Sequence, residues 1–594
     1  MSVRSPKINS LLRVLRTARY LRGSQVAYRL RRIASHKLAW NVRSAVSNLS
    51  NSRDLVTPTA EFPTVPEFLH GYSDGTAILE ELDRGGLGLV NRTLPFSVDS
   101  PDWRLEPQYQ DRLWAITLHY HAWLYQLSTL IRADHHLAPQ ADRVLRSLLA
   151  DWLRVCGFDG RSRDSLAWNS YAIATRAAWW TRLWHGLGPD FWNRHSDLAD
   201  QFLSSMYAQA IYLETHLEWD LRANHLLRDA VGLAWLGRFF AGHQPTRWLR
   251  TATRVAMQQA REQVLPDGGH FERSPMYHLE VMCDFRELAA LLRDTEAQRL
   301  MTETWQRMAK FASWMSHPDG ELPQFNDSGR RPIAETLQSL RDAGDDVPQT
   351  AARGGRFFGD FGMAVWHGGP WTLFFDVGAV GPDYQPGHAH ADTLSIECSF
   401  RGERLFIDPG CHSYDNDEQR AYDRSTAAHN TVSIDGQNSS EVWHIFRVGR
   451  RARPIDVEAV IGQDLFAVTA AHTGFDHLPG NPRHTRSVQV DRPGRLRLVD
   501  NVAGLGRHTV SGGFLVAPQW SVEPVSGGWR LSSAASSLNV RLTTDADVRL
   551  NVARREWHPD YGVELQTNRL EWTCRGDLPV RVIVEITPSE ESAA

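Results

Sequence analysis

The period of the hydrophobic residues changes once along the chain, and this change constrains the fold more than any other feature. Residues 106–340 carry apolar stripes at helical spacing, separated by short breaks of Gly, Pro and Asp. After a segment of linker composition at 341–356, the period becomes 2, in short runs such as RLFIDPG and TRSVQVD. Consecutive helices pack on one another, and many short alternating strands form a sandwich. The sequence therefore predicts an all-α region followed by an all-β region.

Length and composition agree with a multidomain α+β protein. A chain of 594 residues exceeds the size at which a single hydrophobic core stops growing. Its 42% of hydrophobic and 23% of charged residues are typical of globular proteins, which excludes a disordered or fibrous chain. We predict five segments: a basic amphipathic segment (1–53), an extended connector (54–105), a helical domain (106–340), a linker (341–356) and a β-sandwich domain (357–594).

The first 53 residues are strongly basic. They contain twelve Lys or Arg and no acid, whereas the remaining chain has 53 bases against 69 acids. Residues 6–45 predict one or two amphipathic helices, with Leu11, Leu12 and Leu15 on the apolar side. Such a helix could dock on the acidic remainder of the chain, make a peripheral contact with an anionic membrane, or bind an acidic polymer. We expect no nucleic-acid partner.

Export and membrane insertion are both disfavoured by the sequence. No run of 18 apolar residues occurs, which argues against a membrane-spanning helix. Arginines at 13, 16, 19 and 22 interrupt every candidate apolar region of a secretory signal peptide. We therefore expect a cytoplasmic or membrane-peripheral protein, with a periplasmic location as the alternative. The five cysteines include no CxxC pair, which argues against a disulfide framework and against a thiolate zinc site.

Histidines and aspartates gather at the start of the predicted β-domain. His388 and His390 lie in GHAHAD, Asp408 follows in DPG, and His429 follows in RSTAAHNT. Imidazole and carboxylate ligands of this kind suit Zn²⁺, and a satisfied structural histidine pair is the alternative. In an extended strand His388 and His390 would share one face, so only a local bend would let them serve two sites.

Two patches in the helical region place polar groups at expected helix starts. In the first, Asn224 is a candidate N-cap immediately before His225. In the second, Ser274 and Pro275 form an N-cap and N1 pair that puts Tyr277 in the first turn of its helix. The positive end of the helix dipole would slightly favour the phenolate there. Capping and turn formation alone would also account for both patches.

Taken together, these patches resemble the heparinase II/III family of polysaccharide lyases. The densest similarity lies at 387–446, in GHAHADTLSIECSFRGERLFIDPG and RAYDRSTAAHNTVSIDGQNSSEVWHIF. The ANHLL and PDGGHFERSPMYH patches match the same family in the expected order. The resemblance implies an N-terminal α/α-toroid, which is an incomplete helical barrel, followed by a C-terminal antiparallel β-sandwich.

The resemblance also implies β-elimination on an anionic polysaccharide that contains uronic acid, with a 4,5-unsaturated product. The C5 proton is too weakly acidic to be removed while the adjacent carboxylate keeps its full negative charge. In the family's scheme Asn224 and His225 neutralise that carboxylate, and His225 or Tyr277 removes the proton. Tyr277 also protonates the leaving oxygen, and His388 reaches into the cleft. The positions that bind a structural zinc ion (Zn²⁺) in several members match His390, Asp408 and His429.

The proposed role of Tyr277 needs a positive charge nearby, and three other positions depart from the family pattern. A tyrosine acts as a base at neutral pH only beside positive charge, and the sequence offers Arg222, His225 and His278 for this purpose. The departures are Ala223 in place of a second Asn, Asp229 as the candidate for an acid after the Asn-His pair, and Asn326 in place of a Gly.

Substrate contacts are expected on helices that could line a toroid groove. The 22 tryptophans mildly favour a carbohydrate ligand, although core packing is the alternative for each of them. Arg176 is the strongest candidate because a bidentate guanidinium suits a uronate carboxylate. The other predicted substrate-binding residues are Trp168, Asn169, His119 and Tyr120.

Two other functions remain open at this point. One is a non-catalytic protein for carbohydrate binding or exopolysaccharide assembly. The other is a metal-dependent glycan hydrolase, in which His388, His390, Asp408 and His429 would activate water. The sequence does not distinguish heparin or heparan sulfate from alginate or a bacterial exopolysaccharide, nor endo from exo cleavage, and the oligomeric state is also left open.

Overall fold

The chain folds into two compact units. The computed structural model describes residues 6–37, 58–104, 111–157 and 165–589, except for 60–61, 64, 66, 68–72, 352, 463 and 492–493. The helical unit comprises Arg22–Glu262 and Val281–Trp305, and the β-rich unit comprises Met1–Leu21, Gln263–Glu280 and Gln306–Ala594. The units therefore do not follow the linear boundary predicted at 341–356, because helical residues that precede it group with the strands.

The basic N-terminal segment forms two helices, as its periodicity predicts. They are α1 (Pro6–Ala18) and α2 (Gly23–Lys37), and residues 38–53 of the segment lie outside the described residues. Among the helices of the described part, none combines the length and the apolar composition needed to cross a bilayer.

The connector predicted to be extended at 54–105 contains regular structure, so that prediction is wrong in part. It includes α4 (Gly75–Asp83), whose first turn is capped by the Asp74 side chain, and a hairpin of β1 (Gly86–Leu89) and β2 (Arg92–Pro95). The Pro, Gly and Asp residues of this segment cap and turn these elements. Ile78, Leu79 and Leu82 of α4 are buried in the core of the helical unit.

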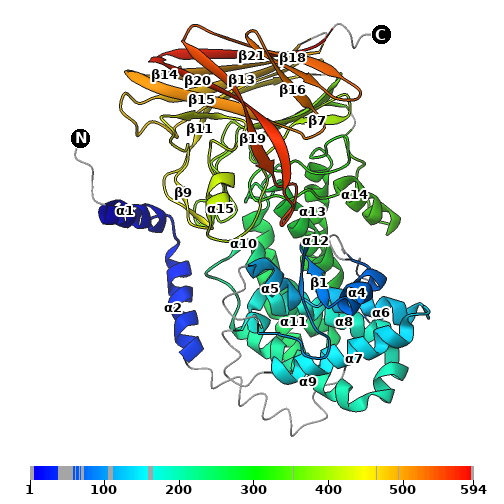
Figure 1. Cartoon of the computed structure of the whole chain (residues 1–594). Helices are drawn as coiled ribbons and strands as arrows, with labels where there is room; N and C mark the ends of the chain where they lie inside the picture. Colours follow the sequence, from blue (N-terminus) through cyan, green and yellow to red (C-terminus); the bar gives the residue numbers. More distant parts are fainter. Residues whose placement is uncertain are drawn as a thin grey trace. The chain divides into compact units, whose positions relative to one another are not determined.

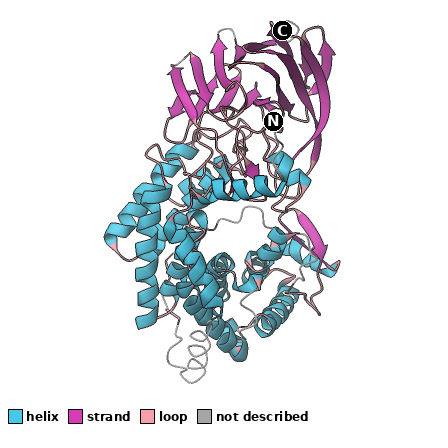
Figure 2. Ribbon diagram, turned by 90° about the vertical axis from the view of Figure 1, so that its left-hand side faces the viewer, coloured by secondary structure: helices cyan, strands magenta, loops and turns pink. Residues whose placement is uncertain are grey.

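Helices of the helical unit pack in two layers. In one layer α4, α6 (Ala122–Arg132), α8 (Ser170–Arg194) and α10 (Ala223–Phe239) are successive neighbours, and α7 (Ala138–Val155) and α9 (Ser196–Thr215) pack on them. Apart from β1 and β2, the described residues of this unit form helices, turns and loops (Figure 2). This is the arrangement expected of an incomplete α/α-toroid. The remaining helices are α5 (Arg112–Leu118), the 3-10 turn η3 (Leu166–Trp168), α11 (His243–Gln263), and parts of α12 (Pro275–Leu291) and α13 (Thr295–Ala312).

Two large antiparallel sheets form the β-rich unit (Figure 1). The first has the order β11-β12-β13-β14-β21-β18-β17-β16, with bounds Pro454–Ile461, Phe466–His472, Arg483–Asp491, Arg495–Ala503, Val580–Pro588, Ser537–Thr544, Gly528–Ser532 and Ser521–Val525. The second has the order β19-β20-β15-β7-β6-β5-β4-β3, with bounds Val548–Trp557, Leu565–Asp577, Arg507–Val516, Glu403–Phe406, Ile396–Phe400, Trp371–Asp376, Met363–Gly368 and Gly354–Phe358. Smaller elements of this unit are β8 (Val432–Ile434), which pairs with β15, β9 (Val442–Trp443), β10 (Arg447–Val448), α1, α14 (Ile333–Asp342) and α15 (Glu418–Asp423).

One hydrophobic core joins the two sheets. Burial alternates along β13 and β14, so that Val488 and Leu498 point inward while their neighbours in sequence do not. The same core contains Phe375 and Phe406 from the second sheet. Since both sheets contribute their apolar faces to a single cluster, the unit is an antiparallel β-sandwich, as the period of 2 predicts.

Candidate active site and metal centre

Local sequence places Tyr277 in the first turn of α12. The Ser274 hydroxyl accepts a hydrogen bond from the Tyr277 N–H (3.3 Å) and donates one to the carbonyl of Asp327 (2.7 Å), and Pro275 is the first helical residue. The predicted cap is thereby confirmed. Because Ser274 also bonds to Asp327, the start of this helix is fixed to the segment that carries the polar network described below.

Tyr277 and His388 lie against each other in the β-rich unit. Their rings stack with centroids 3.7 Å apart and an interplanar angle of 9°. The Tyr277 hydroxyl is 2.9 Å from the hydroxyl of Tyr414. His388 Nδ1 lies 3.4 Å from Glu272 Oε1, so a protonated His388 would form an ion pair there. The sequence analysis gave no role to Tyr414, which no motif marks, or to Glu272, although Glu272 lies within the PDGGHFERSPMYH patch.

Tyr277 is a neutral phenol in this setting. Burial raises its pKa well above the usual value, and Glu280 raises it further, which together outweigh the lowering by the Tyr414 hydrogen bond. His278 supplies no positive charge, because burial lowers its pKa to about 3. Desolvation therefore outweighs the slight preference for the phenolate expected from the helix dipole.

A bend separates the two histidines of GHAHAD. Residues 386–392 form turns and irregular backbone, and the strand β6 begins only at Ile396. The His388 ring faces Tyr277, whereas the His390 ring lies 5.2 Å from that of His429 and its Nε2 bonds to Asp327. The two histidines thus occupy different surroundings, as only a non-extended backbone allows.

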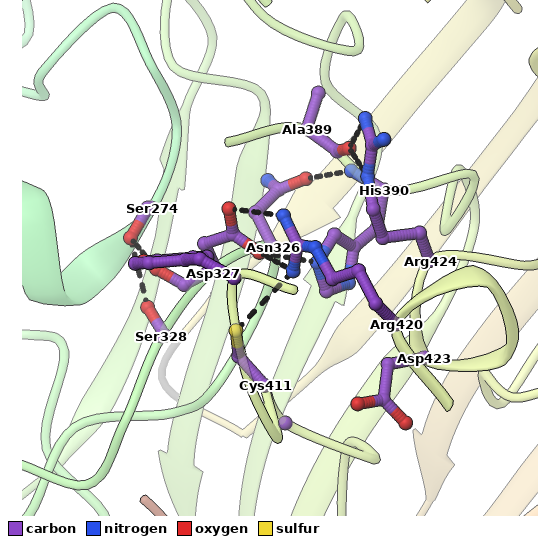
Figure 3. A network of polar contacts seen from close by, with 12 residues as sticks. Ser274, Asn326, Asp327, Ser328, Ala389, His390, Cys411, Arg420, Asp423 and Arg424 are labelled. Carbon is purple, nitrogen blue, oxygen red and sulfur yellow. Dashed lines mark hydrogen bonds and ion pairs between the residues drawn. The ribbon is translucent and has the colours of Figure 1, made fainter. Parts of the chain in front are cut away.

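A buried polar network orients His390 (Figure 3). Asp327 accepts a hydrogen bond from His390 Nε2 (2.8 Å) and is paired with both terminal nitrogens of Arg420. Asn326 Oδ1 accepts a bond from the His390 backbone N–H (2.8 Å), which gives the residue at the family's Gly position a positioning role. Burial alone would raise the pKa of Asp327, but the Arg420 guanidinium outweighs it and holds the pKa well below its usual range.

The three residues expected to bind zinc lie together. His390, Asp408 and His429 are fully buried, and one ligand atom from each lies within 4.8 Å of the others. Among the described residues, neither His390 Nδ1 nor His429 Nε2 has a hydrogen-bond partner. Burial lowers the pKa of each of these histidines to about 4, so both are neutral imidazoles at pH 7. Two imidazoles and a carboxylate fit Zn²⁺, and the bond of His390 to Asp327 is the outer contact that metal-bound histidines commonly make.

In the helical unit, Asn224 and His225 lie in the first turn of α10. The helix begins at Ala223, and its N-cap is Arg222, which has a φ of 60° and makes no side-chain capping bond. Asn224 is therefore not the cap, contrary to the prediction, because the helix starts one residue earlier than expected. Its side chain is buried, and its Oδ1 has no hydrogen-bond partner within the described part of the chain.

His225 is held beside a carboxylate. Its Nδ1 lies 3.0 Å from Glu218 Oε2, and the backbone N–H of Glu218 donates to Asp229 Oδ2 (2.7 Å). The His225 side chain is 32% exposed, and its ring lies 5.0 Å from that of Tyr171. Asp229, the acid expected after the Asn-His pair, is fully buried and therefore positions Glu218 instead of meeting a ligand. Glu218 itself was not predicted.

Three of the predicted substrate contacts are wrong. Arg176 is completely buried and donates to Gln209 Oε1 (2.9 Å) and to the carbonyls of His119 (2.7 Å) and Ala167 (2.8 Å), so it braces helix ends. His119 is also buried, and its Nδ1 accepts from Trp152. Trp168 is buried and donates to the carbonyl of Cys156. All three side chains point into the core, and the sequence pattern does not distinguish a core position from a groove position.

Two predicted substrate contacts stay predictions. Tyr120 is half-buried, and its ring lies 5.9 Å from Tyr171, which in turn contacts His225. Asn169 is half-buried, and its Oδ1 caps α8 by accepting from the N–H of Ala172.

Comparison with known proteins assigns the chain to a family. The C-terminal heparinase II/III-like model matches residues 350–591, and the heparinase II/III N-terminal model matches residues 92–352. A heparin-sulfate lyase of Bacteroides stercoris is 26% identical over 277 residues, which are 42% of this chain and 41% of that protein. A heparin-sulfate lyase of Pedobacter heparinus is 27% identical over 328 residues, which are 51% of this chain and 47% of that protein. The matched region thus spans less than half the length of either lyase.

Solved structures share the fold. A crystal structure of heparinase III superposes with a TM-score of 0.72 at 17% identity, over 96% of this chain and 93% of that one. The fold is therefore a helical toroid followed by a β-sandwich in both chains. With the two family models covering residues 92–591 between them, the chain belongs to the heparinase II/III family.

Proposed function

We propose that the protein is a polysaccharide lyase that cleaves a uronic-acid-containing polyanion by β-elimination. The observation that carries the proposal is the pairing of Tyr277 with His388 and Tyr414, in a chain of the heparinase II/III family. The two relatives named heparin-sulfate lyases make a glycosaminoglycan the first substrate class to examine. A protein used only for binding would not need a buried phenol with a ring-stacked histidine.

Tyr277 suits the role of proton donor. Its raised pKa keeps the hydroxyl protonated at neutral pH, and such a group can deliver a proton to a leaving glycosidic oxygen. The same raised pKa makes it a poor base, which assigns removal of the C5 proton to a histidine. His225 is the candidate for this step, because its Nδ1 lies 3.0 Å from the Glu218 carboxylate and its side chain is 32% exposed.

Asn224 suits recognition of the uronate carboxylate. A neutral amide stabilises charge that spreads onto the carboxylate as the C5 proton leaves, without adding a full cation that would bind ground state and transition state equally. The first turn of α10 directs backbone N–H groups toward the same end, where they favour an anion.

The decisive experiment measures absorbance of the 4,5-unsaturated uronate in the ultraviolet. Purified protein is incubated with heparan sulfate, heparin and alginate, and compared with Tyr277→Phe and with the control Tyr207→Phe, which alters a buried tyrosine of the helical unit. We expect turnover to fall about 10²–10⁴-fold in Tyr277→Phe and to stay unchanged in the control. New reducing ends without absorbance would show hydrolysis instead, and equal rates for both variants would overturn the proposal.

We further propose that His390, Asp408 and His429 hold a structural Zn²⁺ ion. When bound, the ion would link loop segments that are otherwise joined by buried polar contacts, and catalysis would not pass through it. His390→Ala and His429→Ala should each lower the melting temperature together with the zinc content. A chelator should abolish activity only as the fold loosens. Loss of activity at full thermal stability would favour the metal-dependent hydrolase.

A peripheral membrane contact is our proposal for α1. The helix docks on the β-rich unit through its polar side: Arg16 Nε donates to Glu441 (2.7 Å) and Trp443 donates to Thr17 (3.1 Å). Its opposite side exposes Leu11, Val14 and Leu15, which are 60%, 42% and 56% accessible. The spacing of these residues forms one outward apolar stripe, with the exposed Arg19 beside it. An apolar stripe bordered by arginine fits the interface of an anionic bilayer.

Vesicle sedimentation tests the membrane proposal. The protein should sediment with phosphatidylglycerol-containing vesicles and more weakly with phosphatidylcholine alone. The double variant Leu11→Asp, Leu15→Asp should bind at least about tenfold less, since each buried leucine contributes roughly 1.5–3 kcal/mol. Leu505→Asp, at a 75% exposed leucine, is the matched control. Equal vesicle binding by the two variants, or no vesicle binding by the unmodified protein, would overturn the proposal.

A further inference from the structure

A second cluster of metal-ligating side chains lies outside the zinc trio. His412, His558 and Glu564, all in the β-rich unit, place one ligand atom each within 4.8 Å of one another. These three residues are distinct from the candidate catalytic residues and from His390, Asp408 and His429. Two imidazoles and a carboxylate form a donor set that proteins use for Zn²⁺ and related divalent ions.

Two loops are tied together at this cluster. The N–H of His558 donates to the carbonyl of Pro409 (2.9 Å), and the N–H of Gly562 donates to the carbonyl of His412 (3.1 Å). Gly410 has a φ of 77°, and a Cβ at this position would lie 1.9 Å from the His558 carbonyl oxygen. Glycine is therefore required for the loops to approach this closely, which fixes the backbone that carries both histidines.

The His558 ring is buried without conventional partners. Its side chain has no exposed surface, and neither ring nitrogen makes a hydrogen bond within the described residues. Nδ1 lies 3.3 Å from Asp423 Oδ1, and Nε2 lies 3.9 Å from Glu556 Oε2. A buried imidazole that lacks hydrogen bonds is unfavourable, so an ion bound to this ring would remove that penalty.

The surroundings hold His558 in a metal-binding orientation. Asp423 is itself anchored, since its Oδ2 accepts from the N–H of His412 (3.0 Å) and its Oδ1 accepts from Gln419 (2.8 Å). Asp423 therefore faces Nδ1 as a fixed acceptor, which is how carboxylates orient metal-bound histidines. The His412 ring meets the His558 ring edge-on, with centroids 4.8 Å apart.

We propose that His412, His558 and Glu564 form a binding site for a divalent transition metal ion, with Zn²⁺ as the leading candidate and Asp423 orienting His558. Glu564 is exposed, so the ion reaches the buried histidine from solvent through that side. Three protein ligands leave one tetrahedral position for water. The loop of His412 also carries Tyr414, so the ion would steady the residue that contacts the Tyr277 hydroxyl.

Metal content of the full-length chain tests the proposal without relying on activity. The protein is stripped with a chelator, reloaded with Zn²⁺, freed of excess ion, and its zinc per chain is measured by mass spectrometry. We expect Glu564→Gln and His558→Gln each to hold one equivalent fewer than the unmodified chain. The controls Glu523→Gln, at an exposed glutamate, and His508→Gln, at a histidine paired with Asp435, should lose none.

Folding and site identity are checked in the same series. Because Glu564 is exposed, its variant should melt like the unmodified chain in the presence of chelator, whereas added Zn²⁺ should raise its melting temperature less. Cobalt loading should give a tetrahedral visible spectrum that weakens in Glu564→Gln but persists in His429→Ala. Full zinc content in both Glu564→Gln and His558→Gln would overturn the proposal, whatever the substrate assays show.

Discussion

Each unit buries an arginine completely, and the two satisfy it in opposite ways. In the helical unit Arg176 donates to one amide oxygen and two backbone carbonyls, and it packs 4.6 Å from the Trp152 ring centre. In the β-rich unit Arg420 pairs with the carboxylate of Asp327, which also binds His390. Burial lowers the pKa of Arg176 to about 9, whereas Asp327 raises the pKa of Arg420 despite its burial.

The difference shows two ways in which a buried arginine can serve the structure. Arg176 links the end of α5 and the turn η3 to α9 through its three hydrogen bonds, and so holds these elements of the helical unit together. Arg420 neutralises a carboxylate whose other task is to orient a candidate metal ligand. Of these two arginines, Arg176 thus uses neutral acceptors for structure, while Arg420 uses its charge to position a site residue.

Replacing Arg420 should have the largest effect. Arg420→Met leaves Asp327 as a buried uncompensated charge, which should lower the free energy of unfolding by about 3–5 kcal/mol. Urea unfolding measures the loss. The double variant Asp327→Asn, Arg420→Met should recover part of it, because no charge then remains unpaired. Strictly additive losses would mean that the pair does not act as a unit.

The matched change in the helical unit should cost less. Arg176→Met removes three hydrogen bonds to neutral acceptors and leaves those acceptors buried, which should cost about 2–3 kcal/mol in urea unfolding. A loss as large as that of Arg420→Met would contradict the distinction between neutral and charged partners.

Acid should weaken the helical unit through His119. Burial and the nearby Arg176 lower its pKa to about 3, so the folded chain keeps it neutral. The unfolded chain takes up a proton below its ordinary pKa of about 6.5, and stability is therefore lost as pH falls from that value toward 3. The stability difference between the unmodified chain and His119→Gln should shrink by about 2 kcal/mol from pH 7 to pH 5. A constant difference would show that His119 protonates in the folded state.

Tyr414 should have the smallest effect. Tyr414→Phe removes one neutral hydrogen bond from the Tyr277 hydroxyl, which is worth about 0.5–1.5 kcal/mol or roughly a two- to twelvefold slower elimination. Ultraviolet product formation measures the rate. In a Tyr277→Phe background the same change should do nothing further, and an equal additional loss would show that Tyr414 acts by another route.

Sequence reasoning worked where a local pattern decides the outcome. Ser274 and Pro275 form the cap that places Tyr277, and alternating burial along β13 follows from the period of 2. It failed where distant contacts decide. Tyr414 contacts the hydroxyl of Tyr277, which lies 137 residues earlier in the chain, and no sequence motif predicts that contact. The prediction that Asn224 caps its helix failed because Arg222 takes the N-cap position with a positive φ, a conformation that is not expected for arginine from the sequence.

By itself the sequence determined the order of an all-α and an all-β region, the family, and the residue types gathered for chemistry, because periodicity and motifs are properties of neighbours in the chain. Only the tertiary structure decided which polar groups meet. Arg176, predicted to contact the ligand, is buried and bonds to backbone carbonyls instead. The backbone between His388 and His390 is bent, so the two side chains lie in separate surroundings. The physical reason is that burial and long-range pairing determine both the accessibility and the protonation of a side chain. Neither property can be predicted from the neighbouring residues in the sequence.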